Sequence, residues 1–239
     1  MNKMPLLSNL SFGAGEVGDP NRNYHSYGPP SPFSVRIESA LDKRSIGQPW
    51  RYQPQPLPSL SDPSLPANSR YSLLLLSAKE GYPLWRPEPN RRLPEEYRRD
   101  GLYIGSVGIF HDGFFDYLFN ICYPKSHPVN AGGVPEDFKP VEISQTDISE
   151  VDPFHDVDAH VASPIGGVNS RRAYDFMSMS PDGAILVLPD GSTRIDLKNK
   201  KIFRQYANRN AHRWFTYVEN TRGRECEDLS LYIITEPRR

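Results

Sequence analysis

Residues 102–119 read LYIGSVGIF, HDG and FFDYLF, so two apolar runs flank a short polar linker. The linker contains Asp112 and Gly113, and an Asp-Gly pair between apolar runs is a strong signal for a β-hairpin. Gly105 and Gly108 lie inside the first run, where a glycine indicates a bulge or a closely approaching backbone. The sequence therefore predicts a hairpin over these residues, and this is the clearest local signal in the chain.

The strongest helical pattern follows at residues 193–220. Apolar residues recur there at helical spacing, as expected for the buried stripe of an amphipathic helix. The stripe consists of Phe203, Tyr206, Ala207, Ala211, Trp214 and Val218. Ser192 stands where an N-cap belongs, and Gly223 lies beyond the end. We therefore predict one long amphipathic helix at about 193–220.

Five shorter segments have the composition of strands or of a helical turn. Residues 71–76 form a short apolar run whose length favours a buried strand, although periodicity does not separate strand from helix here. Residues 157–161, 184–188 and 229–235 also read as short strands. Residues 94–99 begin with proline and read as one helical turn. The fold predicted from these segments is α+β, with a small, mostly antiparallel sheet, one long helix and extensive loops.

Proline separates the chain into two parts. Of the 239 residues, 24 are proline, about twice the usual share, and eleven of these fall within residues 1–69. Because proline fixes φ and lacks an amide hydrogen, this segment is predicted to be an extended, largely disordered tail. Apolar islands at 33–37 and 50–52 are candidates for short strands or docking points. Residues 70–239 are predicted to form a single α+β domain.

Composition excludes several classes of protein. No stretch approaches the roughly 18 apolar residues of a membrane-spanning helix, and the N-terminus lacks the apolar block of a secretory signal. The formal net charge of −1 argues against a generic nucleic-acid-binding protein. Cys122 and Cys226 are too few for a disulfide scaffold and suit a reducing compartment. We therefore expect a protein of the cytoplasm or nucleus.

A resemblance rests on the motifs GYPLWRPEP, LPEEYRRDGLYIGSVGIF, FDYLFNICYP and GVPEDFKPV, followed by GAILVLPDGSTRIDL and SLYIIT. These motifs are similar to those of a group of uncharacterised proteins from mushroom-forming (basidiomycete) fungi. Ser106 stands where the pattern of that group has aspartate. The resemblance covers roughly 71–235 and implies no known activity. Because the relatives continue past the final strand, it also implies a shortened C-terminus and a last strand left as an unpaired edge.

The sharpest candidate for catalytic chemistry is the segment DPFHDVDAH at 152–160. Two imidazoles with neighbouring carboxylates are a suitable ligand set for zinc or iron. On an extended segment Asp156, Asp158 and His160 point to one side, and His155 is adjacent. No familiar metal spacing matches, and an acidic surface loop with two incidental histidines explains the same pattern. The resulting hypothesis is a metal-dependent enzyme centred on His155, Asp158 and His160.

A second candidate is an aromatic and arginine-rich patch near residue 90. It comprises Tyr82, Trp85, Tyr97, Arg98 and Arg99. Interface cores are enriched in these residue types, so the patch is a candidate site for a partner, a glycan or a small molecule. In the alternative interpretation, Tyr82 and Trp85 are core residues that hold down the proline-rich segment.

Two stretches of opposite charge are candidate docking surfaces. Residues 136–160 hold eight acidic residues and one lysine, a formal charge of −7. Residues 191–224 hold nine lysines or arginines and two acidic residues, a formal charge of +7. These stretches bind partners, neutralise each other or form two solvated faces. Because surface ion pairs are weak and screened, neutralisation or solvation is favoured over docking. A nucleic-acid role would need stacking aromatics, and the helix aromatics fall on the buried stripe.

Nucleophilic catalysis finds little support in the sequence. There is no Gly-x-Ser-x-Gly motif, and Cys122 ends an apolar strand, where a thiol is commonly inert. His127 is five residues away, within reach of a Cys–His pair across a turn. The segment from Gly105 to Gly108 is not a phosphate loop, because it lacks a Lys-Ser/Thr pair and no helical pattern follows it.

We therefore predict a non-catalytic intracellular recognition or scaffold domain with a protein partner. The alternatives are the metal-dependent enzyme and a small-molecule or carbohydrate-binding domain that uses Trp85 and its neighbours. The sequence identifies no cofactor, and nucleic acid is not an expected ligand.

Overall fold

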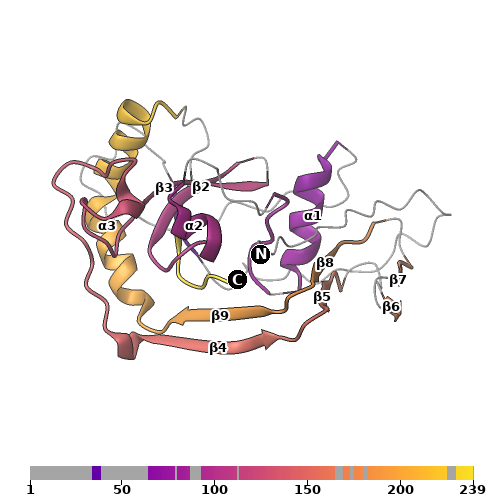
Figure 1. Cartoon of the computed structure of the whole chain (residues 1–239). Helices are drawn as coiled ribbons and strands as arrows, with labels where there is room; N and C mark the ends of the chain where they lie inside the picture. Colours follow the sequence, from indigo (N-terminus) through magenta and orange to yellow (C-terminus); the bar gives the residue numbers. More distant parts are fainter. Residues whose placement is uncertain are drawn as a thin grey trace. The chain divides into compact units, whose positions relative to one another are not determined.

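The structure is a computed structural model (Figure 1). It describes residues 34–38, 64–78, 80–86, 93–111, 113–164, 169–172, 175–179, 182–224 and 230–238. Its helices are α1 (Ala67–Leu76), α2 (Glu95–Asp100) and α3 (Lys200–Thr216), and α3 continues into a π-helical turn, η3 (Tyr217–Thr221). Two short 3₁₀ helices are η1 (Pro128–Asn130) and η2 (Gln145–Asp147). The strands are β1 (Ser34–Glu38), β2 (Ser106–His111), β3 (Phe114–Asn120), β4 (Ile148–His155), β5 (Ala159–Ala162), β6 (Asn169–Arg172), β7 (Asp175–Met177), β8 (Ile185–Leu188), β9 (Ser192–Leu197) and β10 (Ser230–Ile234). Helices beside small sheets confirm the predicted α+β class.

The described residues gather into two compact units, where the sequence predicted one domain for residues 70–239. The first unit contains α1 and the strands β5 to β8, and the second contains α2, α3, β1, β2, β3 and β10. β4 and β9 pair with each other, and the boundary between the units falls within both strands. Figure 1 shows these two strands side by side. β4 was not predicted, because half of its sequence ISEVDPFH is polar and it contains proline.

The second unit is built on a four-stranded antiparallel sheet with the order β1-β10-β2-β3. Its β2–β3 pair confirms the predicted hairpin, although β2 begins at Ser106 rather than at residue 102. The predicted bulge is also present, since the register shifts between Val107 and Gly108. A Cβ atom at Gly108 would lie 2.5 Å from the Asp116 carbonyl oxygen. The hairpin strands therefore approach too closely there for any side chain.

The strand β10 lies inside this sheet. It pairs with β1 on one side and with β2 on the other, so it is not the unpaired edge that the resemblance implied. β1 comes from the predicted N-terminal tail and includes most of the apolar island at 33–37. The remainder of residues 1–63, with the island at 50–52, lies outside the described residues, and so does Cys226.

Helix α3 confirms the predicted apolar stripe but not the predicted start. The stripe residues Phe203, Ala207, Ala211, Trp214 and Val218 are buried, and Tyr206 is half-buried. Ser192 is not an N-cap, because Ser192–Leu197 forms β9 and the helix begins at Lys200 after Asn199. The apolar stripe starts only at Phe203, so none of its residues supports a helix over residues 193–199. The helix packs its stripe into the main core with residues of β2, β3 and β10.

Helix α1 corrects the strand predicted at 71–76. Tyr71, Leu74 and Leu75 are buried, at the three- and four-residue spacing of a helical stripe. They form a small cluster with Ala184, against which Trp85 packs. The run was too short for its periodicity to be read, and tertiary contact decided the conformation.

The other short elements agree more closely with the sequence. The strand at 184–188 is confirmed as β8, and the strand expected at 157–161 is β5, two residues further on. The helical turn at 94–99 is confirmed as α2, with Pro94 as its N-cap rather than its first residue.

Candidate functional site

The four predicted metal ligands surround the turn between β4 and β5. His155 is half-buried, and its Nδ1 atom lies 2.7 Å from the Ser192 Oγ atom on the neighbouring strand. Asp156, Asp158 and His160 are exposed. Within the described residues, no three His, Cys, Asp or Glu side chains gather closely enough to hold a metal ion. The metal site stays a prediction that this geometry does not support.

The predicted aromatic and arginine-rich patch is divided between the two units. Tyr82 and Trp85 belong to the first unit, and Tyr97, Arg98 and Arg99 belong to the second. Trp85 packs against the small core, in line with its alternative interpretation as a core residue, whereas Tyr82 is exposed. Tyr97 is 0% exposed, so its ring does not contribute to any binding surface. Arg98 and Arg99 are exposed on α2.

Cys122 lacks the features of a catalytic thiol. Burial raises the pKa of its thiol to about 12, so the thiol stays protonated at neutral pH. His127 is engaged elsewhere, because its Nδ1 atom accepts a hydrogen bond of 3.3 Å from the Val129 amide and its ring stacks on Tyr123. No hydrogen bond between Cys122 and His127 is present in the described structure, so the pair that the sequence allowed does not form.

A buried polar network that sequence reasoning missed lies beside the hairpin. The Asn120 Nδ2 atom donates to the Ile104 carbonyl oxygen at 3.0 Å and to the Tyr97 hydroxyl at 3.1 Å. That hydroxyl lies 3.1 Å from the Ser106 Oγ atom, and Asn130 Nδ2 donates to the Asn120 carbonyl oxygen at 3.1 Å. Burial raises the pKa of Tyr97, because loss of solvating water disfavours the charged phenolate. The network satisfies its own donors and acceptors, so its role is structural.

The exposed side of α3 is the strongest candidate for a functional surface. The helix contains five lysines or arginines and no acidic residue. Lys201, Arg204, Gln205, Asn208 and Arg209 are all exposed and together form what we term the basic face. Lys201, Arg204 and Arg209 make no ion pair with any residue that the structure describes. The sequence revealed the local excess of positive charge, but only the structure shows which cations are free.

The basic side chains nearest the two ends of α3 already form ion pairs. The Lys200 ammonium group pairs with Glu236, and the Arg213 guanidinium group lies 3.6 Å from Asp137. Lys201, Arg204 and Arg209 therefore lie along the helix between the two paired side chains.

The buried side of α3 holds the basic face in place. Trp214 is 1% exposed and lies edge-on to Phe119, with ring centroids 5.6 Å apart. The Tyr206 hydroxyl donates to the Lys139 carbonyl oxygen, and burial raises the pKa of this tyrosine. The free cations thus project from an anchored backbone, which lowers the conformational entropy lost on binding.

Comparisons with protein-family models, with curated proteins and with solved structures find no match for this chain. The resemblance to the fungal proteins stays a prediction. None of the helices in the described part of the chain is long and apolar enough to cross a membrane. The geometry of the site therefore carries the argument for function.

Proposed function

We propose that this protein is a non-catalytic recognition domain that binds an acidic segment of a partner protein through the basic face of α3. One observation carries the proposal: Lys201, Arg204 and Arg209 are exposed on an anchored helix and form no ion pair within the described residues. Arginine binds carboxylates in bidentate geometry, and lysine adds a flexible point charge, so this set suits Asp and Glu side chains.

An acidic protein segment suits this face better than a nucleic acid does. Bases stack on exposed aromatic rings, and Phe203, Trp214 and Phe215 lie on the buried side of α3. With a formal net charge of −1, the protein also lacks the broad positive field that attracts polyanionic nucleic acids. The low cysteine content suits a reducing compartment, so the proposed place of action is the cytoplasm or nucleus.

The test is an anisotropy titration of the full chain with a fluorescent peptide rich in Asp and Glu, at low and at high salt. We expect binding that weakens as salt rises, because screening acts on exposed charges. The double variant Arg204→Glu/Arg209→Glu should lower the affinity by at least about tenfold, because each reversal turns attraction into repulsion. The matched control, Arg86→Glu/Lys125→Glu, makes the same charge change at exposed positions outside α3.

Equal weakening in both double variants would show a nonspecific charge effect and would contradict the proposal. So would a peptide that fails to bind at low salt. Tighter binding of a single-stranded RNA with the same number of charges, dependent on Arg204 and Arg209, would replace the acidic segment by nucleic acid as the ligand.

A further inference from the structure

An acidic segment, residues 136–152, runs beside α3 within the second unit. It holds six acidic residues and one lysine, a formal charge of −5, against five cations and no acidic residue in α3. Two contacts join the segment to α3 and a third joins it to Lys198, two residues before the helix, in order from the C-terminal to the N-terminal end of α3. They are the Arg213–Asp137 ion pair, the hydrogen bond from Tyr206 to the Lys139 carbonyl oxygen, and the hydrogen bond from the Lys198 amide to the Asp147 carbonyl oxygen. The two oppositely charged stripes therefore run antiparallel, side by side.

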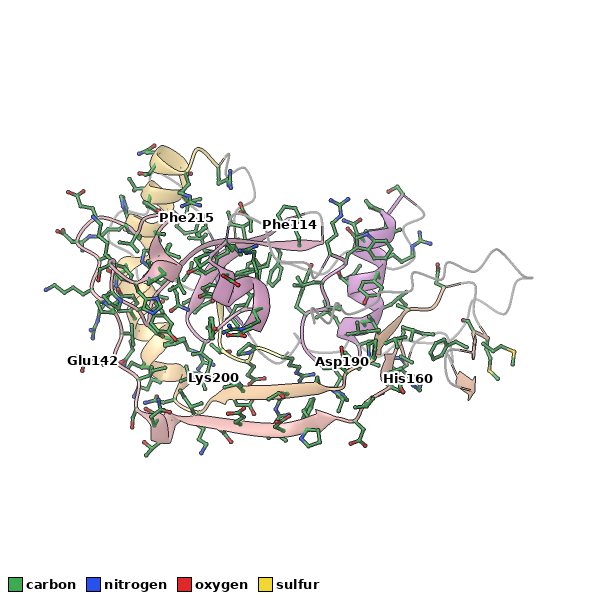
Figure 2. All side chains as sticks on the ribbon, viewed as in Figure 1. Phe114, Glu142, His160, Asp190, Lys200 and Phe215 are labelled. Atoms are coloured by element: carbon green, nitrogen blue, oxygen red, sulfur yellow. The ribbon has the colours of Figure 1, made fainter. Side chains whose placement is uncertain are left out.

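Most charges of these stripes stay available because the segment turns its apolar residues inward. Val141 is 7% exposed, and Phe138 and Ile143 pack against the main core. Glu136 and Glu142 are exposed, and neither forms an ion pair in the described structure. Figure 2 labels Glu142 on this segment and Lys200 at the start of α3.

The one ion pair that the described residues form between the stripes neutralises little of their charge. Arg213 and Asp137 are 3.6 Å apart, and their side chains are 54% and 71% exposed. Exposed pairs of this kind contribute only about 0–1 kcal/mol and are screened by salt. The unit therefore presents a positive stripe and a negative stripe at once.

We propose that two copies of this chain associate through these stripes, with the basic face of each copy on the acidic segment of the other. Adjacent stripes of opposite sign form a self-complementary surface, because a half-turn about an axis between them exchanges positive for negative. A symmetric dimer requires this arrangement, because each of its two equivalent contacts joins the positive stripe of one copy to the negative stripe of the other. The inference rests on the same α3 face as the proposed function, so self-association and an acidic partner compete for Lys201, Arg204 and Arg209.

Sedimentation velocity on the full chain tests this dimer with two double variants. Arg204→Glu/Arg209→Glu lowers the formal charge of α3 from +5 to +1, and Glu136→Lys/Glu142→Lys changes that of the acidic segment from −5 to −1. The wild-type chain should dimerise at about 100 µM in low salt and dissociate at high salt, as a charge-dominated interface does. Each variant alone should remain a monomer, because both of its contacts include a nearly neutral stripe. An equal mixture should form a dimer again, because the unaltered α3 of one variant then meets the unaltered acidic segment of the other.

Recovery in the mixture also shows that both variants are folded. A wild-type chain that stays monomeric in low salt overturns the dimer, and so does a mixture that does not recover. Salt-sensitive assembly into species that grow beyond a dimer with concentration also overturns it, because a head-to-tail contact would then be at work.

The outcomes for the dimer and for the proposed function are separable. Glu136→Lys/Glu142→Lys should keep, and strengthen, binding of the acidic peptide while it abolishes self-association. A monomeric wild-type chain that binds the peptide overturns only the dimer. A wild-type dimer whose monomeric Glu136→Lys/Glu142→Lys variant does not bind the peptide overturns only the proposed function.

Discussion

Among the residues that the structure describes, the two compact units differ in the size of their hydrophobic clusters. In the second unit, seventeen buried residues of the described chain form one cluster, in which Phe119 and Trp214 lie edge to face. In the first unit the corresponding cluster has four buried residues, namely Tyr71, Leu74, Leu75 and Ala184. A fully buried large apolar side chain contributes about 1.5–3 kcal/mol, so these two described clusters differ severalfold in the stabilisation they contribute.

This difference explains where the candidate surface lies. A recognition surface needs a fixed backbone, and α3 has its basic face on one side and the large core on the other. In the described residues, the first unit contains one helix and two-stranded sheets, and two-stranded sheets are marginal by themselves. We therefore expect the first unit to open at a lower free energy than the second.

The largest expected effect on stability comes from truncating a buried side chain in the main core of the second unit. Trp214→Ala removes the side chain that packs against Phe119 and should cost about 3–5 kcal/mol of unfolding free energy. Urea denaturation followed by circular dichroism measures this loss, with Trp214→Phe as the milder control. A loss below about 1 kcal/mol would mean that α3 is not anchored as the structure shows.

A truncation in the small core of the first unit should cost less unfolding free energy, and its effect should stay local. Leu74 is 3% exposed, and Leu74→Ala should cost about 2–3 kcal/mol, at the low end for leucine because a small core collapses around the gap. Hydrogen exchange should show faster exchange of the α1 amides and unchanged protection of α3. Equal loss of protection in both helices would show that the units do not differ in stability.

Alkaline pH acts on both cores through buried tyrosines. Burial raises the pKa of Tyr71 to about 12 and also raises the pKa values of Tyr97 and Tyr117. Because the folded values exceed the unfolded value of about 10, the stabilisation is complete below pH 10 and is lost as pH rises through the folded values.

We expect Tyr71 alone to lower the unfolding free energy by about 2 kcal/mol between pH 10 and pH 12, and Tyr97 and Tyr117 to add to this fall. Tyrosinate absorbance should rise together with the loss of circular dichroism. Full tyrosinate absorbance near pH 10 in a chain that keeps its circular dichroism would be inconsistent with buried rings.

A smaller effect, of opposite sign, is expected from Tyr71→Phe in the first unit. The Tyr71 hydroxyl is buried and has no hydrogen-bond partner among the described residues. Removing an unpaired buried hydroxyl should stabilise the unit by about 1 kcal/mol. Thermal unfolding compares this variant with Tyr117→Phe, which loses a 2.9 Å hydrogen bond to the Val129 carbonyl oxygen and should be destabilised. Equal behaviour of the two variants would argue against the hydrogen-bond assignment.

The smallest effect on stability is expected at the basic face. Arg204→Glu/Arg209→Glu should change the unfolding free energy by no more than about 0.5 kcal/mol, because both side chains are exposed and unpaired in the described chain. Urea denaturation checks this value. A loss of several kcal/mol would mean that these arginines serve the fold rather than a ligand.

Elements that depend on neighbouring residues were predictable from the sequence. The hairpin follows from an Asp-Gly pair between apolar runs, and the α3 stripe follows from helical spacing over several turns. The strand at 71–76 was wrong because one short apolar run suits both conformations. The start of α3 was wrong because strand β9 was included in the helix.

The candidate site was only partly predictable. The excess of positive charge after residue 191 is visible in the sequence, but pairing of Lys200 with Glu236 depends on residues far apart in the chain. The Asn120–Asn130 network gave no signal for the same reason, and Tyr97 was assigned to a surface although it lies in the core.

By itself, the sequence determined the α+β class, the hairpin, the amphipathic helix and the two blocks of opposite charge, because each depends on residues within a few turns or a few strand positions. Only the tertiary structure decided that α1 is a helix, that β10 lies inside its sheet, and that the acidic segment runs beside α3. Those outcomes depend on which distant side chains share a core, and one-dimensional spacing does not record that.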